Sequence, residues 1–365
     1  MKTKLLFTLI LASFLIITGC SSNDSVEESE SASKSSKSGG SSEIHREYPQ
    51  EQREVMKTFG EIGAIITAGA GMGADSEYMD KLISYHAYGD KFTEFNNKQL
   101  YDSAGNEFNE RNTFGVLVAE EGVKKFAALP GTMKVAVYFG NVANVTFVSD
   151  FELQFNGAGS PVPVKNQITL LFVKIDSSWK MVHEHHSLAE SPYIANSTKS
   201  RSTYASNPSL FKSSSNLTES ETTELYQKEI DEVLATFSEI GGIITAGAGS
   251  GYDSEEMDQL ISYHAYGPKF TEFNHGLLFD GAGNEHNERQ TFGVDITKVD
   301  DFAAIPGTMK IAVYGGNVAN VTFISDFDLV HKEYGPITIN NLITLLFIKI
   351  KGEWKMVHEH HSPAN

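Results

Sequence analysis

The stretch Trp179–Ser187, with the sequence WKMVHEHHS, occurs twice in this 365-residue chain, the second time as Trp354–Ser362. The upstream motifs IITAGAG and YHAYG also recur, in the same order. Each copy is far longer than a solenoid repeat and about as long as a typical domain. The chain is therefore predicted to hold two tandem domains, 45–190 and 222–365, joined by a linker at 191–221 that is rich in Ser, Asn and Thr.

Hydrophobic periodicity predicts helices at the start of each copy and strands at its end. Apolar residues recur at helical spacing in the first segment, at Val55, Phe59, Ile62 and Ile66. From Thr132 onward apolar and polar residues alternate as in β-strands, and Gly140-Asn141 suits a tight hairpin turn. We therefore predict an α+β fold in which the N-terminal helices of each domain pack on a curved antiparallel sheet.

The first twenty residues have the organisation of a bacterial lipoprotein signal. Two lysines precede an apolar run, Leu5–Ile17, that is too short to span a membrane. The next residues, Ile17–Cys20 (ITGC), resemble the lipobox at which the lipoprotein signal peptidase cleaves. We predict a signal peptide at 1–19 and lipidation of Cys20, the single cysteine of the chain.

Composition restricts the partners of the mature chain. Residues 20–44 are mostly Ser, Gly, Lys and Glu. They are predicted to form a disordered tether, because they can bury too little apolar surface to offset the entropy lost on ordering. The formal net charge of −18 argues against nucleic acid and anionic lipid as electrostatic partners. The expected partner is a membrane, bound through the lipid on Cys20, with both domains in the cell envelope and facing the periplasm or the exterior.

Helices followed by a long hairpin and a closing strand of the form Trp-x-x-Val-His-x-His-x-Ser resemble the SnoaL-like branch of the nuclear transport factor two superfamily. The closing strand is also similar to that of the association domain of calcium/calmodulin-dependent protein kinase II. The resemblance implies two cone-shaped domains, each with a pocket, that pair through their sheets as an intramolecular pseudo-dimer. Family members include isomerases, cyclases, dehydratases and proteins without catalysis, so the fold does not choose a function. Phe95 and Phe273 stand where the ketosteroid isomerase branch has its catalytic aspartate, which argues against that mechanism.

Strict alternation along the closing strand places His183 and His185 on one face with Trp179 and Met181, and places Glu184 and His186 on the other. A histidine in a pocket would suit general-base chemistry near neutral pH. The alternative interpretation is that these histidines are hydrogen-bonded structural groups. A zinc or copper site is a further alternative, but it needs a third ligand that the spacing does not supply, and no metal is predicted.

The predicted ligand-binding residues of the two domains are Tyr85, His86, Glu94, His183 and His185, with Tyr263, His264, Glu272, His358 and His360 in the second copy. Glu110-Arg111, repeated as Glu288-Arg289, is interpreted as an exposed helical ion pair. The Gly-Ala-Gly at 69–71 lacks the strand and spacing of a nucleotide loop, so it is interpreted as a helix end, and no cofactor is predicted.

Three functional hypotheses remain open at the level of sequence. The favoured one is a binding module that holds a small apolar or aromatic molecule in a pocket of each domain. The second is an acid–base enzyme of isomerase, cyclase or dehydratase type, with His185, His360, Glu94 or Glu272 as the catalytic candidates. The third is a scaffold without catalysis.

Overall fold

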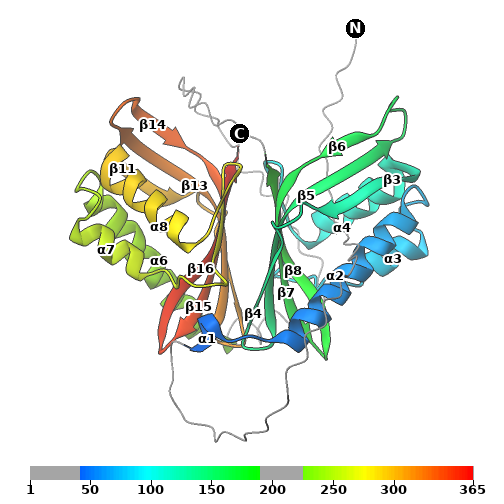
Figure 1. The fold of residues 1–365 in the computed structure, drawn as a ribbon, viewed down its shortest axis with the longest axis horizontal. Helices are drawn as coiled ribbons and strands as arrows, with labels where there is room; N and C mark the ends of the chain where they lie inside the picture. Colours follow the sequence, from blue (N-terminus) through cyan, green and yellow to red (C-terminus); the bar gives the residue numbers. More distant parts are fainter. Residues whose placement is uncertain (1–41, 190–224, 365) are drawn as a thin grey trace, which may run out of the picture.

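The computed structural model of the protein describes residues 42–189 and 225–364. The predicted signal peptide, Cys20 and the linker at 191–221 lie outside these residues. Two domains with the same order of elements are present, each an α+β unit with helices on one side of a curved sheet (Figure 1). In the described ranges, no helix is both long enough and apolar enough to cross a bilayer.

Domain 1 contains four α-helices, a π-helical turn and eight strands. The helical elements are α1 (Ser42–His45), α2 (Pro49–Gly69), α3 (Glu77–Ile83), α4 (Ser103–Asn112) and η1 (Thr113–Leu117). The strands are β1 (Thr93–Asn96), β2 (Gln99–Tyr101), β3 (Val118–Ala128), β4 (Lys134–Tyr138), β5 (Val142–Phe155), β6 (Val162–Val164), β7 (Asn166–Ile175) and β8 (Ser178–Leu188).

Domain 2 repeats the order of domain 1 from α2 onward, and its first helix, α6, is the equivalent of α2. Its helical elements are α6 (Gln227–Gly247), α7 (Glu255–Ser262), α8 (Gly281–Gln290) and η3 (Thr291–Asp295). Its strands are β9 (Thr271–Asn274), β10 (Leu277–Phe279), β11 (Ile296–Ala304), β12 (Lys310–Tyr314), β13 (Val318–His331), β14 (Gly335–Ile339), β15 (Asn341–Ile350) and β16 (Glu353–Pro363).

Local sequence accounts for where the helices begin and end. Ser76 caps α3 by accepting from the backbone N–H of Met79, and Asp102 caps α4 in the same way. Helix α2 ends at Gly69, as the Gly-Ala-Gly interpretation predicts. Gly71 then has φ +73, and a Cβ there would lie 2.3 Å from the backbone N of Glu120, so only glycine fits this turn.

Each domain is built on one sheet, with the order β2-β1-β8-β7-β5-β3 in domain 1 and the equivalent order in domain 2. All strand pairs are antiparallel except β1 with β8, in which Glu94 lies beside Glu184, and its equivalent β9 with β16. The predicted hairpin at Gly140-Asn141 joins β4 to β5. Strand β3 was not predicted, because its residues do not alternate: Glu121 has φ 53 and the β3–β5 register shifts twice.

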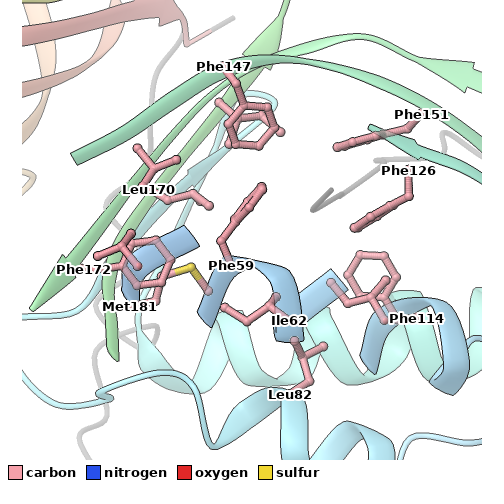
Figure 2. Packing of buried hydrophobic residues seen from close by; sticks show 14 of the residues in the cluster. Phe59, Ile62, Leu82, Phe114, Phe126, Phe147, Phe151, Leu170, Phe172 and Met181 are labelled. Carbon is pink, nitrogen blue, oxygen red and sulfur yellow. The ribbon is translucent and has the colours of Figure 1, made fainter. Parts of the chain in front are cut away.

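The core of domain 1 lies between α2, α3 and the concave face of the sheet. The four apolar residues predicted to form one helical face are all buried there. Phe59 on α2 meets Phe147 on β5 edge-to-face at 5.3 Å, and Phe126 stacks on Phe151 at 4.8 Å. Figure 2 shows these rings together with Phe114 between the helices and the sheet.

The outer faces of the two sheets pack against each other, with the helices on the far sides (Figure 1). Twelve buried apolar residues from both domains form this interface: Ala136, Tyr138, Val142, Leu171, Val182, Ala265, Ala312, Tyr314, Val318, Leu346, Ile348 and Val357. Lysines cross it in both directions, since Lys91 donates to the carbonyl of Val313 at 2.7 Å and Lys134 to that of Phe270 at 2.8 Å.

Helix α1 joins the N-terminal segment to both domains. The Glu43 carboxylate accepts from the Tyr48 hydroxyl at 2.9 Å and from the backbone N–H of Phe139 at 2.7 Å. Lys269 of domain 2 donates to the Glu43 carbonyl at 2.8 Å. Residues 42–44, the last of the predicted tether, are thus part of the packed structure, while 20–41 lie outside the described residues.

Candidate functional site

A β-bulge in the closing strand decides which side chains face the interior. In the β7–β8 pair, Phe172 lies opposite Met181 but Leu171 lies opposite His183, so the register shifts at Val182. Trp179 and Met181 before the bulge belong to the interior core, whereas Val182 packs in the domain interface. Alternation restarts after the bulge, and the face assignment predicted from strict alternation is wrong.

Glu184 and His186, not His183 and His185, share the inner side of β8 beyond the bulge. The Glu184 carboxylate accepts from Nε2 of His86 and Nε2 of His186, both at 3.1 Å, and from Nδ2 of Asn106 at 3.0 Å. Its exposed fraction is 2%. A carboxylate this deeply buried needs such donors, because it has lost its hydration.

Glu94 on β1 stands beside Glu184 and shares Asn106 with it. Its two oxygens accept from Nδ2 of Asn96 at 2.7 Å and from Nδ2 of Asn106 at 2.9 Å. Asn106 in turn accepts from the Tyr88 hydroxyl at 2.5 Å, and the Tyr88 ring stacks on His86 with centroids 5.1 Å apart. The Asn106 side chain therefore links the two carboxylates to the aromatic residues that follow α3.

Glu110, one helical turn beyond Asn106 on α4, is also buried. Its predicted role as an exposed ion-pair partner is wrong, since Arg111 pairs instead with Glu107 and Asp80, both at 2.9 Å. The sequence carried a signal for this, because Asn106 and Glu110 are four residues apart on one helix face and are retained as Asn284 and Glu288. Phe108 on the same helix, replaced by His286 in the second copy, is 72% exposed.

These side chains form what we term the carboxylate cluster: Tyr88, His86, Glu94, Asn96, Asn106, Glu110, Glu184 and His186. Domain 2 builds the same cluster from Tyr266, His264, Glu272, Asn274, Asn284, Glu288, Glu359 and His361. The geometry repeats closely, because Glu359 receives bonds from His264 at 3.1 Å, His361 at 3.2 Å and Asn284 at 2.9 Å.

The three glutamates of each cluster differ in the direction in which their pKa values are shifted. Burial and the neighbouring Glu184 charge raise the pKa of Glu94 to about 7, and the same causes raise that of Glu110 well above its ordinary value. Burial opposes ionisation of Glu184 too, but the bonds from His186 and His86 outweigh it and lower its pKa. The three carboxyl groups of one cluster therefore differ in acidity, which is the pattern of an acid–base site.

Replacing Glu94 by glutamine is expected to change how stability depends on pH. A carboxyl group whose folded pKa lies at about 7, against 4.5 ordinarily, loses its stabilising proton as pH rises through that range. The parent therefore loses stability as pH rises from 5 to 8. Glutamine does not titrate, so the unfolding free energy of Glu94→Gln minus that of the parent should increase by on the order of 2 kcal/mol over this range. Urea titrations in a Trp354→Phe background, with Trp179 as the reporter of domain 1, measure this difference.

The matched control for this prediction is Glu152→Gln, at an exposed position on β5. It should leave the pH profile of the parent unchanged. A constant difference between Glu94→Gln and the parent over the whole pH range would contradict the assigned protonation of Glu94.

The structure separates the predicted ligand-binding residues into three places. His86, Glu94, His264 and Glu272 belong to the carboxylate clusters. His183, His185, His358 and His360 lie in the domain interface, where they bond to hydroxyl groups of the other domain. Tyr85 and Tyr263 bond to helix residues, Glu61 at 3.0 Å and Glu239 at 2.8 Å.

Two further features lie apart from the clusters. A surface depression of about 520 Å³ on domain 2 is lined by α6, the end of α7 and the β15–β16 turn, and no cluster residue borders it. Among residues 42–189 and 225–364, no three His, Cys, Asp or Glu side chains are arranged to hold a metal ion.

The family model for the SnoaL-like domain matches residues 100–191 and 253–365, more than half of the chain. The chain therefore belongs to the SnoaL-like domain family, in a tandem arrangement. No curated protein matches it.

Solved structures similar to this chain each match about one domain's share of it. The association domain of C. elegans calcium/calmodulin-dependent kinase II is 14% identical, covering 38% of this chain and 98% of its own, with a TM-score of 0.29. A nuclear transport factor two-like protein from Salmonella enterica is 19% identical, covering 39% and 89%, with a TM-score of 0.28. A protein described as a candidate dehydratase of this superfamily from Streptomyces avermitilis is 13% identical, covering 38% and 97%, with a TM-score of 0.31.

Proposed function

We propose that the protein is a lipid-anchored envelope protein that binds one small molecule in each domain, at the carboxylate cluster. The observation that carries this proposal is the duplicated set of three buried glutamates on a frame of histidine, asparagine and tyrosine. Grouping three carboxyl groups in the interior is costly for folding, and such groups are typical of sites that recognise or transform a ligand. Anchoring through Cys20 rests on the lipobox of the sequence.

The polar atoms of the cluster favour an uncharged ligand that carries oxygen and an aromatic or apolar body. Protonated Glu94 and Glu110 can donate hydrogen bonds, and an anion would be repelled by Glu184. Within the described part of the chain, Nδ1 of His186 is buried without a hydrogen-bond partner, which leaves one polar atom for a ligand. Rings of Tyr88 and Phe92 beside His86 supply the apolar wall. Entry requires α4 to move away from β1, because it covers the cluster.

Binding of 2-naphthol, a neutral aromatic alcohol, tests this proposal. Isothermal titration of the soluble chain should give two sites, and one should be lost in Glu110→Gln while the other persists. The control is Phe108→Ala on the exposed side of α4, which should retain both. The proposal is overturned if millimolar 2-naphthol does not bind and native mass spectrometry finds no co-purified small molecule.

Acid–base catalysis is the second candidate, and the pKa of Glu94 at about 7 specifically favours it. Exchange of the α-protons of 2-tetralone in D₂O, followed by NMR, reports on a base that removes a proton next to a carbonyl. The parent should accelerate exchange, and Glu94→Gln combined with Glu272→Gln should abolish the acceleration. Equal exchange rates with and without the parent protein would contradict catalysis and leave ligand binding as the proposed function.

A further inference from the structure

Eight buried polar side chains meet in the domain interface. Four are histidines and four are hydroxyl residues: His183, His185, Ser187 and Thr169 of domain 1, with His358, His360, Ser362 and Thr344 of domain 2. The rings of His185 and His360 stack almost parallel, with centroids 3.6 Å apart and planes 8° apart. We term this group the histidine ladder.

Both ring nitrogens of every histidine in the ladder have a hydrogen-bond partner. Nδ1 of His183 lies 2.7 Å from the Thr93 hydroxyl and 3.0 Å from the Thr93 carbonyl, and in the tautomer in which it donates to the carbonyl, Nε2 accepts. The Thr344 hydroxyl donates to that Nε2 at 3.0 Å, and its oxygen then accepts from Nδ1 of His185 at 2.9 Å. Nε2 of His185 is left to accept from the Ser362 hydroxyl at 2.8 Å.

The second half of the ladder obeys the same order with the domains exchanged. Nδ1 of His358 lies 2.8 Å from the Thr271 hydroxyl and 2.9 Å from the Thr271 carbonyl, and in the tautomer in which it donates to the carbonyl, the Thr169 hydroxyl donates to Nε2 at 3.0 Å. Thr169 accepts from Nδ1 of His360 at 2.9 Å, and Ser187 donates to Nε2 of His360 at 2.8 Å. In this tautomer all four rings are neutral, and every Nε2 accepts from a hydroxyl group.

We propose that the histidine ladder makes the domain interface an acid-sensitive switch, in which protonation of the stacked histidines separates the two domains. A proton added at Nε2 of His185 would point at the Ser362 hydroxyl, which would have to turn and give up its own bond. Two charged rings at 3.6 Å would also repel each other strongly, because both are fully buried. Phe95 and Phe273 close the edges of the stack at 5.1 Å, so neither ring can turn away without disturbing the core.

The titratable groups around the stack do not offset this effect. His183 and His358 face it within the interface, Lys134 on β4 lies near His358, and His186 and His361 lie on the inner sides of their strands. Glu184 and Glu359 favour the charged forms of His183 and His358, but burial outweighs them and lowers both pKa values to about 3. Burial and the neighbouring histidines lower the pKa of His185 and His360 well below 6.5.

Separation returns each ring to water and to its ordinary pKa of 6.5, so the separated form takes up protons that the paired form does not. Pairing is therefore fully present above that pH and weakens as pH falls below it. At pH 5.5 each exposed ring favours separation about tenfold, and the stacked pair about 100-fold.

Small-angle scattering of the full soluble chain between pH 7.5 and 4.5 tests the switch. The radius of gyration of the parent should rise as pH falls below 6, and His185→Asn with His360→Asn should move this rise to lower pH, because asparagine keeps an uncharged donor and acceptor. The control is His286→Asn, at an exposed position on α8, and its radius of gyration should change with pH as that of the parent does. A radius that stays constant to pH 4.5, or a transition unmoved in the double variant, overturns the proposal.

A second measurement covers the case in which the double variant separates at every pH. Nitrogen-15 NMR of the parent at pH 6 should find four imidazoles that are neutral and protonated at Nδ1. Four rings that titrate near 6.5 while the domains stay paired would overturn the proposal independently of any variant.

Discussion

Replacement of Glu184 by alanine is expected to lower the free energy of unfolding of domain 1 by about 3–5 kcal/mol. The carboxylate is the shared acceptor of His86, His186 and Asn106, and all of these side chains are buried. Removing it leaves three buried N–H donors without this acceptor. The loss in unfolding free energy is therefore that of several unsatisfied buried donors, which exceeds that of a single lost hydrogen bond. Urea unfolding followed by Trp179 in a Trp354→Phe background measures the change.

Two comparisons make the Glu184 result specific. Glu184→Gln keeps one acceptor oxygen and the side-chain volume, so its loss should be smaller than that of alanine. Glu152→Ala, at an exposed position on β5, should change stability by less than about 0.5 kcal/mol. A loss below about 1 kcal/mol for Glu184→Ala would mean that Glu184 does not organise the cluster.

The fold could be predicted from the sequence because its signals are local and periodic. The apolar positions of α2 and the alternation of β4 and β5 each result from one regular element facing one core. Strand β3 escaped prediction because Glu121, at φ 53, interrupts its alternation. Bulges of this kind depend on how a strand meets its neighbour, which a single segment does not record.

The candidate site was predicted only in part, for the same reason. His86 and Glu94 were identified, but the bulge at Val182 exchanges the two faces of β8, so Glu184 and His186 enter the cluster in place of His183 and His185. The burial of Glu110 follows from α4 covering β1, a tertiary contact that outweighs the usual preference of glutamate for the surface. Retention of Asn106 and Glu110 at helical spacing in both copies was the available signal.

Replacement of Phe59 by alanine is the second large effect, with an expected loss of about 3–5 kcal/mol in the stability of domain 1. Phe59 is 1% exposed and packs edge-to-face on Phe147 at 5.3 Å, between α2 and the sheet (Figure 2). Its equivalent Phe237 contacts Phe323 at 5.1 Å but is only partly buried, so Phe237→Ala should cost less. Phe108→Ala, at a 72% exposed position, should be nearly neutral.

The Phe59 measurement also decides between a filled and a hollow cone. If aromatic rings fill the space under the sheet, deleting one creates an apolar cavity, and a small apolar probe such as benzene should bind there and restore part of the lost stability. If the cone is hollow in solution, Phe59 already borders empty volume, and its removal should cost little more than transfer of the ring to water. A large loss together with rescue by benzene in Phe59→Ala, and neither effect in Phe108→Ala, would show that side chains fill the space under the centre of the sheet, and would leave the carboxylate cluster as the proposed ligand site.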